Sequence, residues 1–157
     1  MNDPAAARPH ELRLDLPAAH SAERMARGVL RQFAQREGVP EPEIDSLEFV
    51  AGELLTNAVD HGGGERALFE EDLRSRVRMT LVLVVRPGGW TLRVSDQGGG
   101  DPAELRQRIG AGGEPDLDDE RGRGFFLLAQ MVDRLDVVPS EDGLGVEFVA
   151  TRSYPEP

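Results

Sequence analysis

The amino-acid sequence predicts an α+β fold, a two-layer α/β sandwich in which a mixed, mostly antiparallel sheet carries helices on one face. The first observation behind this prediction is a pair of apolar segments, 77–85 and 90–95, joined by the turn residues 87–89. Two apolar strands separated by a short Pro/Gly turn are typical of a β-hairpin. The second observation is another strand pair, 136–139 and 146–152, near the end of the chain. Helical patterns fall between these strands in the order βα, α, ββ, α, ββ, which favours helices on a single face.

The N-terminal part of the chain is expected to be a flexible tail followed by one strand and one helix. Residues 1–10 are rich in Ala and Pro. Residues 11–16 alternate polar and apolar side chains, as a half-buried strand does. Ser21 is placed to cap a helix, and Gly38 and Pro40 are placed to end it. The apolar residues expected on the buried face of this helix are Met25, Val29, Leu30 and Phe33.

A second helix is expected to begin near Asp45, because Glu48 stands three residues later, as in a capping box. The glycines at 62–64, which directly follow His61, are expected to end this helix. The buried stripe of the helix would consist of Leu47, Val50, Leu54 and Ala58.

The segment that follows residue 98 is polar and rich in glycine, and we expect a lid at about residues 101–121. A short helix is expected inside this segment at 103–109, and a longer helix at about 124–135. The sequence contains no internal repeat and no second domain pattern. Residues 11–157 are therefore expected to form a single domain.

The composition argues against several classes of function. The chain has 157 residues and a net charge of −11, which disfavours nucleic acid because phosphate contacts need a basic surface. The absence of cysteine excludes disulfides, thiolate metal sites and cysteine nucleophiles. No apolar run approaches the ~18 residues that span a bilayer, and the N-terminus lacks the apolar centre of a signal peptide. We therefore expect a cytoplasmic protein.

Glu53 and Asn57 stand four residues apart, so on a helix their side chains lie one above the other on the same face. A carboxylate can act as a general base, and a neutral amide oxygen suits Mg²⁺. An acidic protein also needs a local cation to bind an anionic ligand. The two residues equally fit a solvated helix face, although an Asn inside a helix is mildly unfavourable. His61 is interpreted as a partner of the helix C-terminus or as a packing residue rather than as a metal ligand.

Asp96 directly follows an apolar strand, at a position where ligand sites are common. A buried carboxylate there can accept a hydrogen bond from an exocyclic amine such as that of adenine. Gly98 and Gly100 would let the backbone approach a flat ring, because neither residue has a Cβ. Taken alone, these residues also fit a turn that ends a strand, since Asp and Gly are typical turn residues.

Gly122, Arg123 and Gly124 directly precede the last predicted helix. The N-terminus of a helix offers unpaired N–H groups and the positive end of the helix dipole, and glycines let a phosphate come close. The segment is not a Walker motif, because the chain has no lysine. On their own, these glycines fit a flexible hinge equally well.

Together, and in this order, the three segments resemble the GHKL family of ATP-binding proteins. That family includes histidine kinase catalytic domains, type II topoisomerase ATPases and heat-shock chaperone ATPases. Residues 53–61 match its N box, residues 96–100 its G1 box and residues 122–124 its G2 box. The resemblance extends from about residue 12 to residue 151 and implies the Bergerat ATP-binding fold. The compact length and residues 53–62 look most like the bacterial anti-sigma-factor serine/threonine kinases.

This resemblance implies a role for each candidate residue. Glu53 would be the general base that draws the proton from a serine of a partner protein. Asn57 would coordinate an Mg²⁺ ion that bridges the phosphates of ATP, and Asp96 would recognise the adenine amine. The remaining cofactor-binding residues would be Gly98 and Gly100, which shape the adenine pocket, and Gly122, Arg123 and Gly124, which hold the phosphates.

The resemblance also implies partners. The protein would bind a sigma factor in one state and phosphorylate a STAS-domain anti-anti-sigma protein in another, and it would form a homodimer. It would contact neither nucleic acid nor a membrane directly.

The chain departs from the family pattern in two places. Phe125 and Phe126 stand where small or aliphatic residues are usual, which would make the hinge of the lid bulkier. Val146 stands where a threonine is common near the phosphates. Loss of that hydroxyl would weaken nucleotide binding or slow phosphate transfer, while Glu53 and Asn57 remain.

Two alternative functions stay open. The Val146 departure favours an ATP-binding regulatory adaptor that has the same fold but no kinase activity. A detached histidine-kinase catalytic domain would need a phosphoacceptor histidine on a dimerising helical hairpin. The chain has only His10, His20 and His61, and no room for that hairpin.

Overall fold

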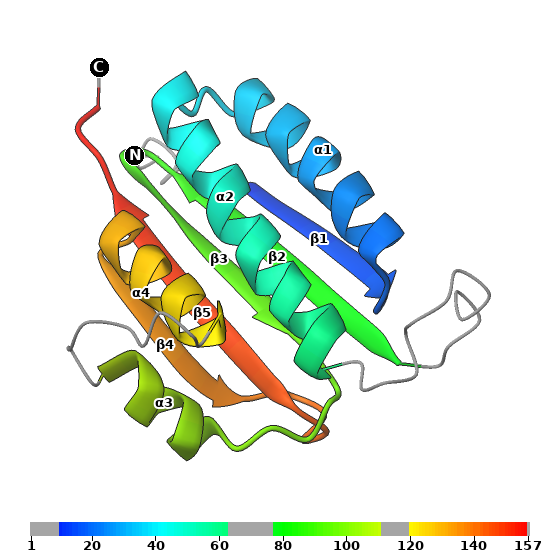
Figure 1. Cartoon of the computed structure of the whole chain (residues 1–157). Helices are drawn as coiled ribbons and strands as arrows, with labels where there is room; N and C mark the ends of the chain where they lie inside the picture. The colour runs from blue at the N-terminus through cyan, green and yellow to red at the C-terminus, as the bar shows by residue number, and fades with distance from the viewer. Residues whose placement is uncertain (1–9, 63–76, 111–119, 157) are drawn as a thin grey trace, which may run out of the picture.

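A computed structural model describes residues 10–62, 77–110 and 120–156 of the protein. Its strands form one five-stranded sheet in the order β1-β2-β3-β5-β4, and every neighbouring pair is antiparallel. The described helices lie together on one face of this sheet, which gives two layers (Figure 1). The predicted α+β fold is therefore confirmed. The strands are β1 (His10–Pro17), β2 (Arg78–Arg86), β3 (Gly89–Ser95), β4 (Arg134–Pro139) and β5 (Val146–Ser153).

The helical layer is built around one central helix. The described helices are α1 (His20–Arg36), α2 (Glu41–Asn57), the π-helical turn η1 (Ala58–Gly62), α3 (Pro102–Gly110) and α4 (Glu120–Met131). Figure 1 shows α2 across the middle of the sheet, with α1 on one side and α4 on the other. The short helix expected at 103–109 is confirmed as α3.

The strands have the two-residue period that places one face of the sheet under the helices. In β2, every second side chain from Met79 to Val85 is buried, and the residues between them are half-buried. The antiparallel register pairs Leu83 of β2 with Leu92 of β3, and both side chains are fully buried. The hairpin between these strands turns at Gly88, whose φ of 73° is the left-handed conformation that glycine adopts without strain.

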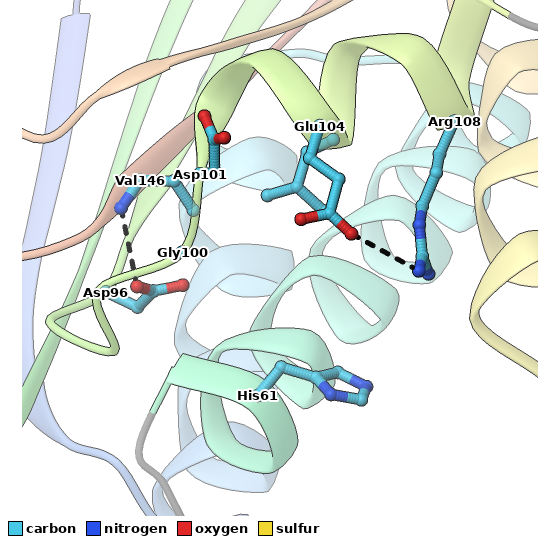
Figure 2. Close-up of a pocket in the computed structure, with 8 residues that line it drawn as sticks. His61, Asp96, Gly100, Asp101, Glu104, Arg108 and Val146 are labelled. Atoms are coloured by element: carbon cyan, nitrogen blue, oxygen red, sulfur yellow. Dashed lines mark hydrogen bonds and ion pairs between the residues drawn. The ribbon is translucent and has the colours of Figure 1, made fainter.

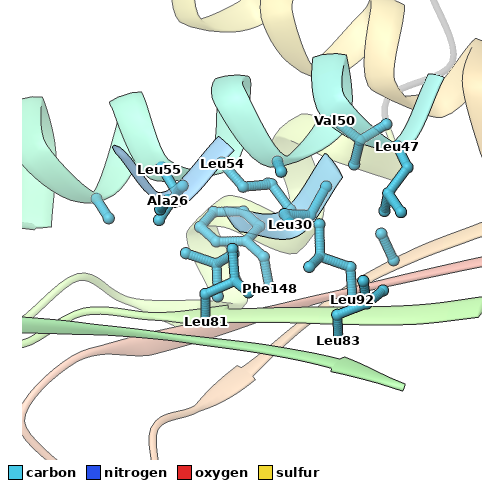
Figure 3. Packing of buried hydrophobic residues seen from close by; sticks show 14 of the residues in the cluster. Ala26, Leu30, Leu47, Val50, Leu54, Leu55, Leu81, Leu83, Leu92 and Phe148 are labelled. Atoms are coloured by element: carbon cyan, nitrogen blue, oxygen red, sulfur yellow. The ribbon is translucent and has the colours of Figure 1, made fainter. Parts of the chain in front are cut away.

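The hydrophobic core lies between α2 and the central strands. Figure 3 shows leucines of α2 packed above Leu81, Leu92 and Phe148 of the sheet. Leu54 and Leu55 are both 0% exposed, and each buried leucine contributes about 1.5–3 kcal/mol. Because this core anchors α2, the polar residues of the same helix are held at fixed positions.

The buried face of α1 differs from the predicted one. Met25 is 59% exposed and Val29 is 37% exposed. A helix that lies close to its neighbours needs small side chains at the contact, so the bulkier residues are left at the margin. The prediction was right for Leu30, and Phe33 packs partly against the core. The residues buried together with Leu30 are Ala22, Glu23, Ala26 and Ala34.

The predicted cap of α1 was wrong. The helix begins at His20 after Ala19, which makes no side-chain cap bond, so Ser21 lies inside the first turn. The end of the helix near Gly38 agrees with the prediction, since α1 stops at Arg36 and Gly38 has a positive φ.

The predicted start of the second helix was also wrong. α2 begins at Glu41, four residues before Asp45, and a proline stands in its first turn, where no intrahelical N–H is required. The carboxylates of Asp45 and Glu48 lie 3.0 Å and 2.7 Å from the guanidinium of Arg31. These two carboxylates therefore join α2 to α1 instead of capping α2.

Some sequence predictions concern residues that the structure does not describe. Residues 1–9 of the expected tail, Gly63 and Gly64, and residues 111–119 of the expected lid lie outside the described ranges. His10 was counted with the tail but already belongs to β1. Of the described helices, none combines the length and the apolar character that crossing a membrane would require.

Candidate functional site

Asp96 lies just past the end of β3 and is only 7% exposed. Its backbone N–H donates to the carbonyl oxygen of Val146 at 3.0 Å. Its Oδ1 accepts hydrogen bonds from the N–H groups of Gly98, at 3.0 Å, and of Val146, at 3.4 Å. Both the backbone and the carboxylate of Asp96 are therefore fixed against β5 before any ligand arrives.

The turn that leads into β5 packs directly on Asp96. A Cβ on Gly145 would lie 2.4 Å from both the carbonyl oxygen and Oδ1 of Asp96, so no larger side chain fits there. Gly99, which has a φ of 72°, donates its N–H to the carbonyl of Leu144 at 2.8 Å. The loop 96–100 and the β4–β5 turn thus form one unit.

Asp142 organises this unit from the side of the turn. Its carboxylate accepts hydrogen bonds from the Leu144 N–H at 2.9 Å, from the Gln97 side chain at 3.0 Å and from the Ser140 hydroxyl at 2.7 Å. These bonds, with that from Leu144 the largest cause, lower the pKa of Asp142. The carboxylate therefore stays ionised and keeps the turn closed over the 96–100 loop.

A small pocket of about 100 Å³ opens beside Asp96. Figure 2 shows His61 at one side of this pocket and the pair Glu104 and Arg108 of α3 at another, with Asp96 at the base of the 96–100 loop. The Arg108 guanidinium lies 3.6 Å from the Glu104 carboxylate. A buried acceptor and a partly exposed cation at the rim suit a ligand with an amine-bearing ring and an anionic end. The residues that line the pocket are His61, Asp96, Gly100, Asp101, Glu104, Leu105, Arg108 and Val146.

Glu53 lies on α2 between neighbours from two other helices. A Cβ on Gly124 of α4 would lie 3.2 Å from its Oε2, so the carboxylate lies close to the backbone near the start of α4. Partial burial, followed by the negative charge of Glu23 on α1, raises the pKa of Glu53. No arginine or histidine pairs with Glu53 within the described part of the chain. A carboxylate with raised proton affinity and no counter-ion is suited to accept a proton or to attract a cation.

Asn57 is the last residue of α2 and is half-buried, one turn after Glu53. The π-helical turn η1 begins at the next residue, Ala58, whose N–H donates to the carbonyls of both Leu54 and Leu55. Such turns are frequent at functional sites. No cluster of three or more His, Asp or Glu side chains that could hold a metal occurs among the described residues. A magnesium ion at Asn57 would therefore take most of its oxygen ligands from phosphates and water, as Mg²⁺ commonly does.

Gly122 and Gly124 were predicted to precede a helix, but α4 begins at Glu120 and includes both. Tertiary packing explains the earlier start, because Phe125 is 2% exposed and its ring stacks at 5.5 Å on that of Phe148. Gly122 lies in the first turn of α4, where N–H groups without intrahelical partners occur, whereas Gly124, the fifth residue of the helix, lies just past this turn. Arg123 is exposed. Phosphate binding at a helix N-terminus remains compatible with this geometry.

The structure brings the predicted site residues together in two groups. It also shows two further residues beside them that were not predicted. Asp96 and Gly100 share the pocket, and Glu53 contacts Gly124. Sequence reasoning missed Gly145, although its pattern with Asp142 and Gly143 is typical of a tight turn. It also missed Glu23, whose signal was a single acidic residue on the otherwise small, apolar face of a helix.

A comparison with known protein families matches residues 16–149 to the histidine kinase-like ATPase domain. The chain belongs to this family. The GHKL resemblance inferred from its three short segments is therefore confirmed, and membership implies that the chain binds ATP.

Individual relatives agree with this family. The chain is 26% identical to the anti-sigma F factor of Geobacillus stearothermophilus over 149 residues, which are 94% of each chain. Its fold is similar to a chain of the SiaB–SiaC complex from Pseudomonas aeruginosa, with a TM-score of 0.64, 17% identity and coverage of 90% and 87% of the two chains. It is also similar to a structure of the RsbU and RsbW domains from Mycobacterium tuberculosis, with a TM-score of 0.57 and 16% identity. That match covers 94% of this chain and 33% of the Mycobacterium tuberculosis chain.

Proposed function

We propose that this protein is an ATP-dependent serine/threonine protein kinase that acts as an anti-sigma factor in the cytoplasm. It binds a sigma factor and phosphorylates a STAS-domain anti-anti-sigma protein. The observation that carries the kinase assignment is the position of Glu53, a half-buried carboxylate without a counter-ion against the start of α4. The similarity to an anti-sigma F factor supports the choice of partners.

In this proposal the two regions of the site bind opposite ends of ATP. Asp96 accepts a hydrogen bond from the adenine amine, with Gly98 and Gly100 beside the ring. Gly122, Arg123 and Gly124 bind the phosphates at the start of α4. The segment of about 101–121 serves as a lid on a single domain that extends from residue 11 to residue 157.

The oxygen ligands of the proposed site, the Asn57 amide and the phosphates of ATP, suit Mg²⁺. When bound, the ion would neutralise charge on the phosphates. Asn57 would hold it through its amide oxygen, which makes no hydrogen bond within the described residues. Glu53 would accept the proton of the attacking hydroxyl, and its raised pKa makes it a better base near neutral pH.

A phosphate-transfer assay tests the proposal. Purified protein, Mg-ATP labelled at the γ-phosphate and a STAS-domain protein are combined, and label is followed onto a serine or threonine. Glu53→Ala should reduce the transfer rate by about 10²- to 10⁴-fold, as expected for loss of a general base. The control is Glu11→Ala, which removes an exposed carboxylate on β1 and should transfer at the normal rate. A normal rate in Glu53→Ala would refute the assigned role.

One observation favours a second candidate, an ATP-binding adaptor that transfers no phosphate. Val146 is 2% exposed and lines the Asp96 pocket, so the hydroxyl of the threonine that is common in the family is absent from the adenine end of the proposed site rather than from its phosphate end. Tight ATP binding without transfer to any STAS-domain protein, in the same assay, would establish the adaptor and exclude the kinase.

We also propose that the protein forms a homodimer. This predicts a mass by light scattering of twice the 17.2 kDa of the chain.

A further inference from the structure

Gln97, the residue directly after Asp96, uses its side chain to connect two other parts of the sheet. Its amide oxygen accepts a hydrogen bond from the backbone N–H of Arg78 at 2.9 Å, and its Nε2 donates to Oδ2 of Asp142 at 3.0 Å. Arg78 is the first residue of β2, and Asp142 lies in the turn between β4 and β5. Because β2 and β5 are the two neighbours of β3, this one side chain joins both sides of the strand that leads to Asp96.

The register of the sheet shows what the Gln97 side chain replaces. The pairing of β2 with β3 ends at Thr80 and Ser95, and two further residues along each strand would bring Arg78 opposite Gln97. The N–H of Arg78 donates to the side chain of Gln97 instead of to a backbone carbonyl. A backbone N–H at the end of a strand needs such a partner. The main chain can therefore leave the sheet after Asp96 while the end of β2 stays bonded.

Asp142 extends this connection to Asp96 through the turn. The hydroxyl of Ser140 donates to Oδ1 of Asp142 at 2.7 Å and accepts the N–H of Gly145 at 3.0 Å. Gly145 packs on Asp96 without space for a Cβ. A shift of Asp142 would therefore move the backbone against which the Asp96 carboxylate rests.

The direction of the Asp96 carboxylate matters for the base that is bound. Figure 2 shows one carboxylate oxygen on the bond to the N–H of Val146 and the other turned away from Val146, toward the side where His61 lies. In the proposed site, the exocyclic amine of adenine donates to this carboxylate. Hydrogen bonds weaken steeply when donor and acceptor are misaligned. The preference for a base with an amine therefore depends on how firmly the carboxylate is held.

A side-chain amide suits position 97 because it carries a donor and an acceptor at the same end. A carboxylate at this position could accept from Arg78 but would repel Asp142. An apolar side chain of similar length could make neither bond. The chemistry of the amide, and not its size alone, therefore connects β2 to the turn.

We propose that Gln97 and Asp142 are positioning residues that give the site its preference for a base with an exocyclic amine. Neither side chain lines the pocket beside Asp96. They act through Asp96, by joining the sheet where β3 ends and by holding the turn against the carboxylate. This inference rests on the proposed role of Asp96 in adenine recognition and adds the residues on which that role depends.

The experiment measures dissociation constants of the full-length protein for ATP and for purine riboside triphosphate, which lacks the amine. The ratio of the two constants reports the contribution of the amine, and the wild type should prefer ATP about 10- to 100-fold. Gln97→Met should lower this ratio about fivefold, because the carboxylate is then misaligned. A merely structural role would change the free energy of unfolding, measured with urea, and leave the ratio of the folded protein unchanged.

A reciprocal exchange of the two side chains provides the sharper test. Gln97→Glu brings two carboxylates together, and Asp142→Asn turns an N–H group toward another N–H group, so each should lower the ratio about fivefold. In the double variant Gln97→Glu/Asp142→Asn, the new amide donates to the new carboxylate, which still accepts the N–H of Arg78. The ratio should return to within about twofold of the wild type. A double variant no better than either single variant would overturn the proposal.

Gln35→Glu is the matched control. Nε2 of Gln35 donates to Oε1 of Glu41 at 3.0 Å, so this change removes the same kind of bond, but neither residue lines the pocket. Its ratio should equal that of the wild type, and an equal loss in this variant would contradict a specific role of Gln97.

Asp96→Asn separates failure of the positioning role from failure of the adenine assignment. If Asp96→Asn removes the preference for ATP but Gln97→Met and Gln97→Glu keep it, the positioning role is overturned and the assignment of Asp96 stands. If Asp96→Asn keeps the preference, the assignment of Asp96 and the positioning role both fail.

Discussion

Asp96 and Glu53 are both carboxylates at the edge of the hydrophobic core, but their surroundings differ. Asp96 is 7% exposed and receives hydrogen bonds from two backbone N–H groups, and Gly145 packs against it without space for a methyl group. Glu53 is half-buried, has no ion pair within the described part of the chain, and lies beside the backbone of Gly124. The first region is complete on its own. The second has no counter-ion among the described residues, and phosphates, a cation or a partner protein would complete it.

Asp96→Asn should produce the largest loss if the preformed region recognises adenine. An amide that replaces the carboxylate loses a charge-assisted hydrogen bond worth about 1.5–3 kcal/mol, so ATP affinity should fall about 10- to 100-fold. Calorimetric titration with ATP measures the change, and Glu53→Gln provides a control that should keep wild-type affinity. Unchanged affinity in Asp96→Asn would mean that adenine binds elsewhere.

Gly145→Ala tests the rigidity of the same region without changing a charge. The new Cβ would lie 2.4 Å from two oxygens of Asp96, so the loop must move, at a cost of about 1–3 kcal/mol in the free energy of unfolding. Urea denaturation measures this loss. The matched control is Gly28→Ala in α1, where no atom lies within 4 Å of the new Cβ. That variant should gain about 0.5–1 kcal/mol, and equal effects at the two glycines would show that the Asp96 contact is unimportant.

Gly124→Ala makes the corresponding change beside Glu53 and should have a smaller effect. The Cβ would lie 3.2 Å from Oε2, at the end of a flexible side chain that can move by a few tenths of an ångström. Displacing the base by this amount should slow phosphate transfer about fivefold. Single-turnover kinetics measure this rate, and ATP titration measures any effect on the phosphates that Gly124 binds in the proposed function. An unchanged transfer rate would show that Gly124 does not position Glu53.

The smallest effect concerns stability and its dependence on pH. Burial, and then the charge of Glu23, raise the pKa of Glu53. A carboxyl group with a raised pKa in the folded state contributes stability at low pH, and this contribution is lost as the pH rises through the folded-state pKa. Glu53→Gln is neutral at every pH, so its free energy of unfolding should exceed that of the wild type near pH 8, and the difference should disappear at about pH 4. Urea denaturation over this range measures it, and a constant difference would exclude the pKa as its cause.

The sequence was sufficient to predict the order of the helices and strands. It was not sufficient to predict helix faces and helix ends that depend on packing between elements. The strand pattern of β2 and β3 predicted the sheet, since a period of two with a Pro/Gly turn has few other solutions. The face of α1 was misassigned because hydrophobicity counts Met25 more heavily than Ala26, whereas close approach favours the smaller side chain. The start of α2 was misassigned because Asp45 binds Arg31, and a contact between two helices leaves no local signal.

In the candidate site, too, contacts between residues close in the sequence were predictable, whereas contacts between distant residues were not. Asp96 and Gly100 were predictable as a pair, because they are close in the sequence and share the pocket. The contact of Gly145 with Asp96 was not, because 49 residues separate them and only the pairing of β3 with β5 brings them together. Gly124 beside Glu53 is a further contact of this long-range type.

The central helix α2 contributes residues both to the core and to the site. Leu54 and Leu55 are fully buried, while Glu53 and Asn57 on the neighbouring face of the helix are half-buried. Each residue turns the helix by about 100°, so deletion of one residue before Glu53 would place Leu54 at the position from which Glu53 faces α4, and would move the Glu53 carboxylate to the position of Gly52, beside Glu23 and Arg27. Substitutions at single positions are therefore far easier for this helix to tolerate than any change in its length. We expect natural variation in chain length to accumulate in the connections around α2 rather than within it.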